Sequence, residues 1–334
     1  MRAFVLTSYG GPEHTVLTDV PQPSPRAGEL LIRVRAAGLN PVDYKTRAGR
    51  LRVIRRYPLP IVMGNELSGV VEDLGPGARR FAKGDRVFAR VDRDTMGALA
   101  ELAVVHEEHV ARMPTSVDFP AAAAVPLAAL TALQALRDEL HVRAGQRVFI
   151  PGGAGGVGTF AIQIAKLLGA HVATTASPRG QALVARLGAD VVIDYTRQRF
   201  EEKVSGYDSA FDLLGGDTLA RLWSTLKPGG RVVSIAGRPE PVTARKDLKR
   251  GSGLAALFWI ASLTTRFRAA RRGISYRYLF MHPSGADLAY LASLIDDKKL
   301  EVIIDRVFPF AEVKEAVAYL ETGHAKGKVV VAMN

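Results

Sequence analysis

The sequence of 334 residues contains no cysteine. This absence excludes disulfides, thiolate catalysis and every zinc site with cysteine ligands, and it is consistent with a reducing compartment. The longest notable apolar run, residues 254–263, is far shorter than the roughly 20 residues that a membrane-spanning helix needs. A strand-like segment begins at residue 2, with no basic and then apolar leader before it. We therefore expect a cytoplasmic protein.

Positive charge is concentrated in one segment. Residues 245–272 hold eight arginines and lysines against one acid, Asp247, and so carry +7 of the net charge of +12. A nucleic-acid-binding protein would place such charge on an element that reads a groove. No such element is evident, and we expect no nucleic-acid partner. The basic residues flank the apolar run 253–263, as in a helix that lies on an anionic membrane surface. A lid over a substrate, or packing in a subunit contact, is the favoured alternative, and any membrane contact is expected to be peripheral.

The most informative pattern is a glycine turn, G-x-G-x-x-G, formed by Gly153, Gly155 and Gly158. The first glycine allows a tight turn, the second lets the backbone approach a pyrophosphate, and the third permits close packing of helix and strand. With 32 glycines in the chain the pattern alone is weak, but an apolar strand precedes it and a helix follows. A dinucleotide site is therefore predicted, with Gly156 and Val157 at the helix N-terminus that faces the phosphates.

An NAD site carries Asp or Glu about 20 residues beyond the glycines, to hold the ribose 2′-hydroxyl. Here no carboxylate occurs between Gly158 and Asp190. Thr175, Ser177 and Arg179 stand at the end of the next strand instead, and a guanidinium can fork onto a phosphate. These residues favour the 2′-phosphate of NADPH. The alternative is that Arg179 is only a solvated loop residue.

Two kinds of pattern divide the chain. Residues 1–120 contain short β-rich runs separated by proline and glycine, and the alanine-rich residues 119–140 predict a helix interrupted near Pro126. From residue 145 strands and helices alternate, which predicts right-handed βαβ units and a parallel sheet. We expect strands near 147–151, 171–176, 191–194, 209–214 and 231–236, and helices near 157–168, 179–187 and 217–226. A helix near 285–299 and strands at 302–304 and 329–331 indicate a return to the first domain.

Short motifs in a fixed order cover nearly the whole chain. They lie at residues 37–45, 64–71, 84–87, 130–132, the glycine turn, 187–195 and 323–328. This ordered set resembles the zinc-free quinone oxidoreductase branch of the medium-chain dehydrogenase/reductase superfamily, in particular its NADPH-dependent, chloroplast-envelope quinone oxidoreductase-like group. The resemblance implies an α/β fold, with a Rossmann doubly wound parallel sheet domain and a β-rich GroES-like catalytic domain. The expected boundaries are 1–122 for the catalytic domain, 123–283 for the NADPH-binding domain and 284–334 for the return.

Zinc-dependent members of the superfamily bind their metal through cysteine and a G-H-E motif. Here Asn65 takes the place of the histidine and only Glu66 remains, so no metal site is predicted. The residues from His106 to His109 do not have H-E-x-x-H spacing, and we expect them to form a solvated loop. Without a Lewis acid, alcohol oxidation loses its usual route to an alkoxide. Hydride transfer to a quinone or an α,β-unsaturated carbonyl stays feasible. Reduction of an activated alkene rather than a quinone, and a non-catalytic NADPH-binding redox sensor, are the alternatives.

The resemblance also implies roles for single residues. Lys45, Tyr44 and Asn40 are the candidate catalytic residues, on a turn that lies over the nicotinamide in this family. Lys45 would stabilise negative charge on the acceptor oxygen and Tyr44 would orient the acceptor or supply a proton. An equal alternative is that Lys45 contacts a carboxylate or the cofactor ribose and that Tyr44 only packs, and Asn40 is expected mainly to shape the turn. The other candidate cofactor residues are Thr131, Tyr195, Leu214, Gly215, Ala236, Gly237, Gly327 and Lys328.

Oligomeric state stays open at this point. Relatives often form dimers through the edge of the nucleotide-binding sheet, and residues 274–281 would supply that edge strand.

Overall fold

The computed structural model describes residues 1–333. The chain forms two compact units. One contains residues 1–130 together with the chain from Pro283 onward, and the other contains residues Thr131–His282.

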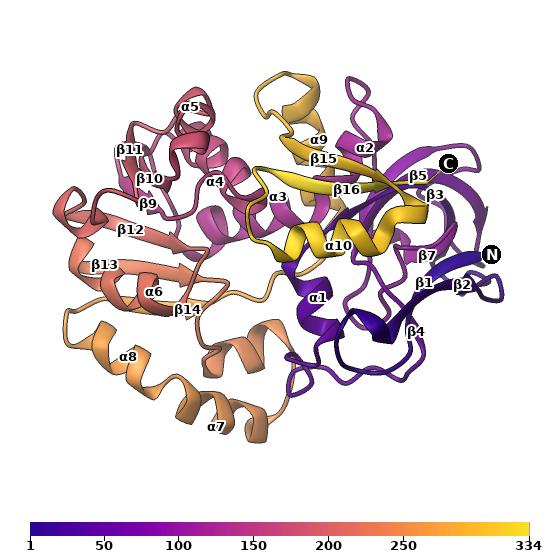
Figure 1. The fold of residues 1–334 in the computed structure, drawn as a ribbon, viewed down its shortest axis with the longest axis horizontal. Coiled ribbons are helices and arrows are strands. Elements are labelled where there is room, and N and C mark those ends of the chain that lie inside the picture. The colour runs from indigo at the N-terminus through magenta and orange to yellow at the C-terminus, as the bar shows by residue number, and fades with distance from the viewer. Residues whose placement is uncertain (334) are drawn as a thin grey trace. The chain divides into compact units, whose positions relative to one another are not determined.

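The first unit is built on two sheets (Figure 1). The larger has seven strands in the order β15-β16-β3-β5-β6-β8, with β7 also paired to β3, and the smaller has the order β2-β1-β4. Its strands are β1 (Arg2–Leu6), β2 (Thr15–Asp19), β3 (Glu29–Leu39), β4 (Ile61–Val62), β5 (Glu66–Leu74), β6 (Arg86–Arg90), β7 (Leu102–His106), β8 (Val110–Arg112), β15 (Ile304–Pro309) and β16 (Lys328–Ala332). Its helices are α1 (Pro41–Arg47), α2 (Phe119–Ala123), α9 (Gly285–Asp296) and α10 (Val313–Glu321), and α3 (Pro126–Leu133) leads into the second unit.

The second unit contains a six-stranded sheet in the order β11-β10-β9-β12-β13-β14. Every neighbouring pair in it is parallel. Its strands are β9 (Arg147–Ile150), β10 (His171–Ala176), β11 (Val191–Asp194), β12 (Tyr207–Asp212), β13 (Leu226–Ser234) and β14 (Ser275–Tyr278). Its helices are α4 (Gly156–Leu167), α5 (Pro178–Arg186), α6 (Gly216–Leu222), α7 (Ser252–Ala261) and α8 (Leu263–Ala270), with π-helical turns at Gln134–Glu139 and Thr243–Asp247.

Strand order confirms the predicted fold class. Counted from β9, the order is 3-2-1-4-5-6, which is that of the doubly wound dinucleotide-binding sheet. After the exposed Arg147, the central strand β9 is apolar, because both faces of a parallel sheet are covered: Val148, Phe149 and Ile150 are fully buried. The order in which the strands are added reverses between β9 and β12, and ligands bind such sheets at the carboxyl ends of the strands beside that reversal.

Most predicted elements of this sheet are confirmed, with shifted ends. The strand predicted at 209–214 ends at Asp212, and the one predicted at 231–236 ends at Ser234, because both side chains bind the loops that follow. The helix predicted at 217–226 is α-helical to Leu222 and continues as a 3₁₀ turn over Trp223–Thr225. The predicted edge strand within 274–281 is present as β14.

The return segment differs more from prediction. The strand predicted at 302–304 is wrong, because pairing with β16 begins only at Ile304 and continues to Pro309. The helix predicted at 285–299 ends at Asp296. The expected loop at His106 contains a 3₁₀ turn, Glu107–His109. Within residues 1–333, no helix has the length and apolar character to cross a bilayer.

Candidate functional site

The glycine turn joins β9 to α4 in the second unit. A Cβ on Gly158 would lie 2.5 Å from the carbonyl oxygen of Gly152, and one on Gly153 would lie 2.1 Å from Oγ1 of Thr174. Gly152 itself has a φ of +82°. The protein's own packing therefore requires glycine at both ends of the motif, as expected for a tight turn and a close helix.

Gly155 has a different environment. A Cβ there would meet only the carbonyl oxygen of Gly152, at an ordinary 3.5 Å, and the backbone φ is −79°. No side chain caps the N-terminus of α4, of which Gly155 is the N-cap residue. The first N–H groups of a helix have no partner within it and form a favourable site for phosphate. Space beside Gly155 is thus open where a pyrophosphate is expected.

The end of β10 lies against this turn. The backbone N–H of Gly152 donates to Oγ1 of Thr175 at 2.9 Å, and a Cβ on Gly180 would lie 2.9 Å from Cβ of Ala154. The structure therefore brings the start of α5 close to the glycine turn. Ser177 is the N-cap residue of α5, its side chain makes no capping bond, and Arg179 is exposed two residues later.

An acid that the sequence analysis did not consider ends the neighbouring strand. Asp194 is the register partner of Ala176. Its Oδ1 accepts from the N–H and the hydroxyl of Thr196 at 2.9 and 2.6 Å, and these bonds lower the pKa of Asp194. The carboxylate is therefore engaged in its own turn. Tyr195, predicted at the adenosine end, follows it and is 60% exposed.

Asp212 and Ser234 organise the other half of the carboxyl edge. Asp212 is fully buried at the end of β12, where its Oδ1 accepts from the N–H groups of Leu214 and Gly215. Ser234, at the end of β13, donates to Oδ2 of Asp212 at 2.6 Å. Burial raises the pKa of Asp212, and these bonds oppose the increase.

The glycines in these loops are required by close backbone contact. Gly215 has a φ of +68°, and a Cβ there would lie 2.3 Å from the carbonyl oxygen of Ala236. A Cβ on Gly237 would lie 2.5 Å from the hydroxyl of Tyr276. Leu214 extends to within 3.0 Å of the ideal Cβ position of Gly152, so the loop after β12 lies beside the glycine turn.

Sequence analysis missed Asp212 and Ser234. The available signal is a polar residue that ends a buried apolar strand and is followed by glycine within three residues. That pattern occurs in both strands.

A second, wholly buried polar cluster lies in the first unit. Lys328, on β16, donates from Nζ to the carbonyl of Leu39, to Oδ1 of Asn40 and to Oε1 of Glu66, at 2.9, 2.6 and 2.7 Å. An ammonium has three N–H groups, so its donor capacity is used within this cluster. Asn40 completes the link through Nδ2, which donates to Oε1 of Glu66 at 2.6 Å. Leu127 binds the other oxygen of Glu66 through its backbone N–H.

Asp43 extends the cluster into α1. Its two oxygens accept from the backbone N–H of Asn40 at 2.7 Å and from Nδ2 of Asn65 at 2.6 Å. Burial raises the pKa of Asp43 to about 6, against the effect of these bonds. Arg90 is buried next to this cluster and donates to the carbonyls of Asn65 and Val91. Burial lowers the pKa of its guanidinium. The charges come from strands far apart in the sequence, so linear motifs did not reveal this cluster.

Tyr44 and Lys45 lie on α1, directly after Asp43, and are half-buried. Burial lowers the pKa of the Lys45 ammonium, and nearby Arg50 lowers it further. Burial raises the pKa of the Tyr44 hydroxyl, with a smaller effect from Glu321. The buried cluster thus holds one side of α1, while the two candidate catalytic side chains are on the same short helix.

Three further residues complete the candidate set. Thr131 is buried in α3, Ala236 is half-buried after β13, and Gly327 has a φ of +91° with Ile303 packed against it. A Cβ on Gly327 would lie 2.4 Å from the carbonyl oxygen of Ile303. Cofactor contacts for all three stay predictions. In residues 1–333, no group of three or more histidines and acids is arranged to hold a metal ion.

Comparison with known proteins gives matches over both units. Residues 26–115 match the alcohol dehydrogenase GroES-like domain, and residues 187–331 match a family described as zinc-binding dehydrogenase. A mitochondrial NAD(P)H oxidoreductase of Danio rerio is 35% identical over 326 residues, 91% of this chain and 84% of the relative. A chloroplastic NADPH-dependent alkenal/one oxidoreductase of Arabidopsis thaliana is 36% identical, with 99% and 79% covered. The solved structure of a quinone oxidoreductase from Coxiella burnetii has a TM-score of 0.87 at 32% identity, covering 100% of this chain and 99% of the other.

The chain belongs to the medium-chain dehydrogenase/reductase superfamily. The resemblance to its quinone oxidoreductase branch is confirmed, as is the combination of a GroES-like and a Rossmann domain. The chain is therefore an oxidoreductase of this superfamily that uses a nicotinamide dinucleotide.

The predicted cytoplasmic location is contradicted. The Danio rerio and Arabidopsis thaliana relatives are named as mitochondrial and chloroplastic proteins, and these names overturn the prediction. The prediction depended on the absence of cysteine and of an apolar leader. Neither feature distinguishes the cytoplasm from other reducing compartments.

Proposed function

We propose that this protein is an NADPH-dependent, metal-free reductase of quinones or α,β-unsaturated carbonyls. The observation that carries the proposal is the carboxyl edge of the parallel sheet, where the glycine turn, Ser177 and Arg179 meet with no acid at the end of β10. A hydroxyl, a guanidinium and free helix N–H groups suit a 2′-phosphate. The name of the alkenal/one oxidoreductase relative, NADPH-dependent, supports the same choice.

The buried cluster supports the absence of a catalytic metal. Asn65 takes the position of a zinc-binding histidine, and its amide is engaged with Asp43. Glu66 is neutralised by Lys328, with Arg90 nearby. A zinc site needs three protein ligands and an open position, and the two fixed cations Lys328 and Arg90 beside Glu66 do not fit a dication. The proposed reduction therefore uses no zinc.

The acceptor needs two electrons and two protons for full reduction. Bound NADPH supplies hydride, which provides both electrons and one proton. Lys45 stabilises the negative charge that develops on the acceptor oxygen, and its lowered pKa makes it a better proton donor than a free lysine. Tyr44 orients the acceptor through its hydroxyl. The second proton comes from Lys45 or from water and completes the hydroquinone or the saturated carbonyl.

The buried residues serve this helix as supports. Asp43 binds the backbone N–H of Asn40 at the start of α1, and Lys328 and Glu66 hold the Asn40 side chain. Removing one partner of a buried ion pair typically costs about 3–5 kcal/mol, because the other charge is left uncompensated. We therefore propose that Asn40 positions Tyr44 and Lys45 and does not itself react.

A steady-state assay of the purified protein tests the proposal. NADPH and NADH are each supplied with a benzoquinone, a naphthoquinone, a 2-alkenal and a 2-alkenone. Cofactor oxidation is followed by the absorbance of the reduced nicotinamide at about 340 nm. We expect turnover with NADPH that survives dialysis against a chelator. Loss of turnover that added zinc restores would contradict the metal-free proposal.

The acceptor panel also separates the two candidate acceptors. Turnover of the alkenal and alkenone but not of the quinones favours activated-alkene reduction, the activity in the name of the Arabidopsis relative. Turnover of quinones favours the activity in the name of the Coxiella structure. Tight NADPH binding without oxidation by any acceptor supports the non-catalytic sensor.

A further inference from the structure

Exposed apolar side chains are concentrated on α7 and α8. Ile260 is 67% exposed, Phe267 60% and Trp259 49%, and Leu257 and Leu263 are also exposed. We call these five residues the apolar face. They recur at helical spacing and so occupy one side of the two consecutive helices. Scattered exposed leucines need no explanation, but a contiguous patch on a folded protein indicates an interaction.

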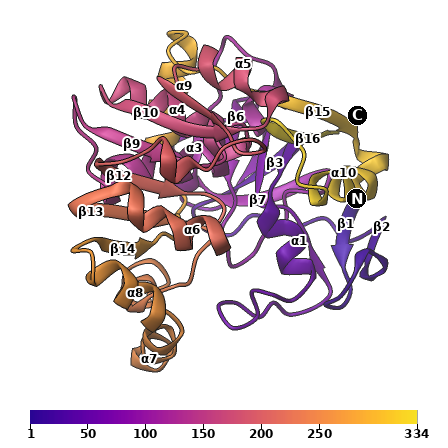
Figure 2. The ribbon, with the colours of Figure 1, turned by 60° about the vertical axis from the view of Figure 1, so that its left-hand side comes forward.

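The opposite side of the two helices is anchored in the second unit. Ala255, Phe258 and Ala269 are buried, and Ser262, at the junction of α7 and α8, donates from Oγ to the carbonyl of Phe258 at 2.7 Å. In both views α8 lies beside β14, the edge strand of the parallel sheet (Figures 1 and 2), and α7 packs against the π-helical turn at Thr243–Asp247. The apolar face is therefore held outward by a fixed inner side.

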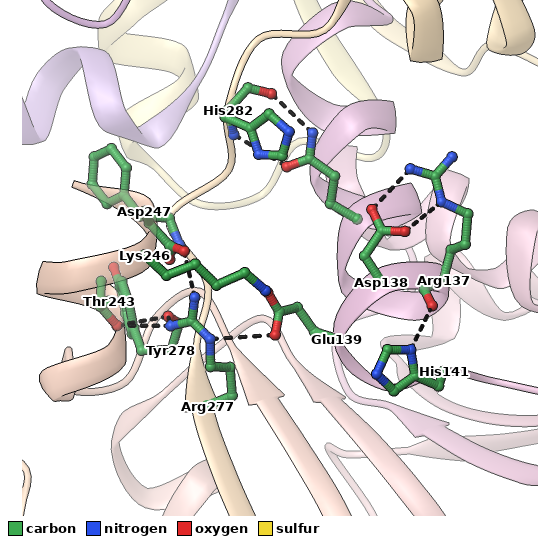
Figure 3. A network of polar contacts seen from close by, with 12 residues as sticks. Arg137, Asp138, Glu139, His141, Thr243, Lys246, Asp247, Arg277, Tyr278 and His282 are labelled. Atoms are coloured by element: carbon green, nitrogen blue, oxygen red, sulfur yellow. Dashed lines mark hydrogen bonds and ion pairs between the residues drawn. The ribbon is translucent and has the colours of Figure 1, made fainter. Parts of the chain in front are cut away.

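The only acid in the basic segment is already used within the fold. Figure 3 shows Arg277 of β14 between Asp247 and Glu139, and it also binds Glu240 at 2.8 Å. Lys246 pairs with Glu139 at 2.7 Å. These ion pairs fasten the π-helical turn before α7 to the sheet. They leave no free acid in the segment to balance its other cations.

The other exposed basic residues of the segment have no acidic partner within residues 1–333, and Arg271 lies over the ring of Phe267. No acidic residue occurs from residue 248 to residue 286. Six cations of the segment are exposed and, within residues 1–333, make no ion pair: Arg245, Lys249, Arg250, Arg268, Arg271 and Arg272. The apolar face thus has a rim of uncompensated positive charge.

We propose that the apolar face docks on the surface of an anionic lipid bilayer, with α7 and α8 lying in the plane of the interface. An exposed apolar stripe with tryptophan and a basic rim is the pattern of interfacial helices, which sink about 5–10 Å into the headgroup region. Anionic headgroups complement the six exposed cations. A second copy of the chain is disfavoured as the occupant, because pairing two such faces would bring two positive rims together.

Vesicle sedimentation with the full chain tests the docking. We expect it to pellet with vesicles that contain phosphatidylglycerol, not with pure phosphatidylcholine, and to be released by high salt. The triple variant R268Q/R271Q/R272Q should weaken binding roughly 100-fold, since each interfacial cation contributes about a factor of five. The matched control R56Q/R79Q/R80Q removes three exposed arginines elsewhere and should bind as the wild type does.

Intrinsic fluorescence gives a second readout that locates the contact. The chain has two tryptophans, of which Trp223 is 4% exposed in the core and Trp259 is 49% exposed. A blue shift on anionic vesicles therefore reports Trp259, and the W259F variant should lose the shift but still pellet. I260S/F267S should reduce pelleting at least 10-fold, whereas the control V53S/V307S, at exposed apolar sites elsewhere, should not.

NADPH binding checks that each variant is folded, because none of these residues lies in the dinucleotide site. The proposal does not depend on turnover, so the two can fail separately. Absence of pelleting and of a blue shift with anionic vesicles would overturn it. A doubled mass in size-exclusion chromatography that I260S/F267S abolishes would also overturn it, and would assign the apolar face to a second copy of the chain. An I260S/F267S protein that loses turnover but pellets as the wild type does would assign the face to a lid.

Discussion

Ser234 and Asp212 are register partners on neighbouring strands of the parallel sheet and are joined by a hydrogen bond of 2.6 Å. Each also accepts two backbone N–H groups from the loop that follows its own strand. One buried pair therefore sets the paths of two adjacent loops at the edge of the sheet where the dinucleotide is expected. This pair therefore preorganises the loops after β12 and β13 in the proposed dinucleotide site.

Replacing Ser234 with alanine tests this pair. The change removes the donor to Asp212 and the acceptor for two N–H groups, so we expect the free energy of unfolding to fall by about 1–3 kcal/mol. NADPH and NADH affinity should fall together, because both loops lose support. Ser209 is the matched control, since its buried hydroxyl on β12 has no hydrogen-bond partner among residues 1–333 and S209A should be neutral. Equal effects of the two substitutions in urea denaturation would contradict the assigned role.

Glycine substitutions separate packing from binding. G158A should destabilise the protein, because its Cβ would lie 2.5 Å from a backbone oxygen. G155A meets only a contact at 3.5 Å, so the fold should persist while dinucleotide affinity falls at least roughly 10-fold as the methyl group blocks the pyrophosphate. Calorimetric titration and thermal melts measure the two effects. G253A, on exposed helix α7 with open space around it, is the control. Unchanged NADPH affinity in G155A would exclude the expected phosphate position.

Arg179 should determine the preference for the phosphorylated cofactor. We expect R179Q to weaken NADPH binding roughly 10–100-fold, the value of a charge-assisted contact, and to leave NADH binding unchanged. R186Q, at the other end of α5, is the control for general effects on that helix. Titrations that show wild-type protein to prefer NADH would remove the basis for this assignment.

Lys45 should act on the chemical step rather than on cofactor affinity. Loss of one group that stabilises developing charge typically lowers kcat by roughly 100-fold, and K45Q is expected to do so with unchanged Kd for NADPH. K45R, which keeps the charge, should retain part of the activity. K314Q, on the exposed side of α10, serves as the control. A K45Q protein with wild-type kcat would assign turnover to other groups.

Asp43 predicts a specific pH dependence of stability. Its pKa in the fold is about 6 against an ordinary value of 3.8, so the unfolded chain releases this proton first as pH rises. The stability contributed by the protonated form is complete below about 3.8 and is lost as pH rises through 6, by up to about 3 kcal/mol. The stability difference between wild type and D43N in urea should therefore narrow between pH 4 and 6 (about the two pKa values). A constant difference, or a carboxyl NMR titration with a midpoint below 4 (roughly the unfolded value), would refute it.

Local patterns were enough for the parallel sheet and the glycine turn. An apolar strand, a glycine turn and a helix occur within neighbouring residues, so their spacing carries the prediction. Strand ends were predicted less well. The side chains of Asp212 and Ser234 end their strands by binding N–H groups of the following loops, and these contacts form only on folding. The strand predicted at 302–304 failed for a related reason, since its start depends on where β16 begins to pair.

The sequence alone established the alternation of strands and helices and the glycine turn without a following acid. It also established the apolar run near residue 260 that basic residues flank. All are properties of short stretches of chain, in which side-chain type and spacing act directly. Folding was needed to place Lys328 beside Asn40 and Glu66, and to show that Trp259 and Ile260 point outward while Phe258 is buried. Such facts depend on contacts between distant segments and on which side of a helix the core covers. The hydrophobic pattern of α7 is too uniform to specify that side in advance.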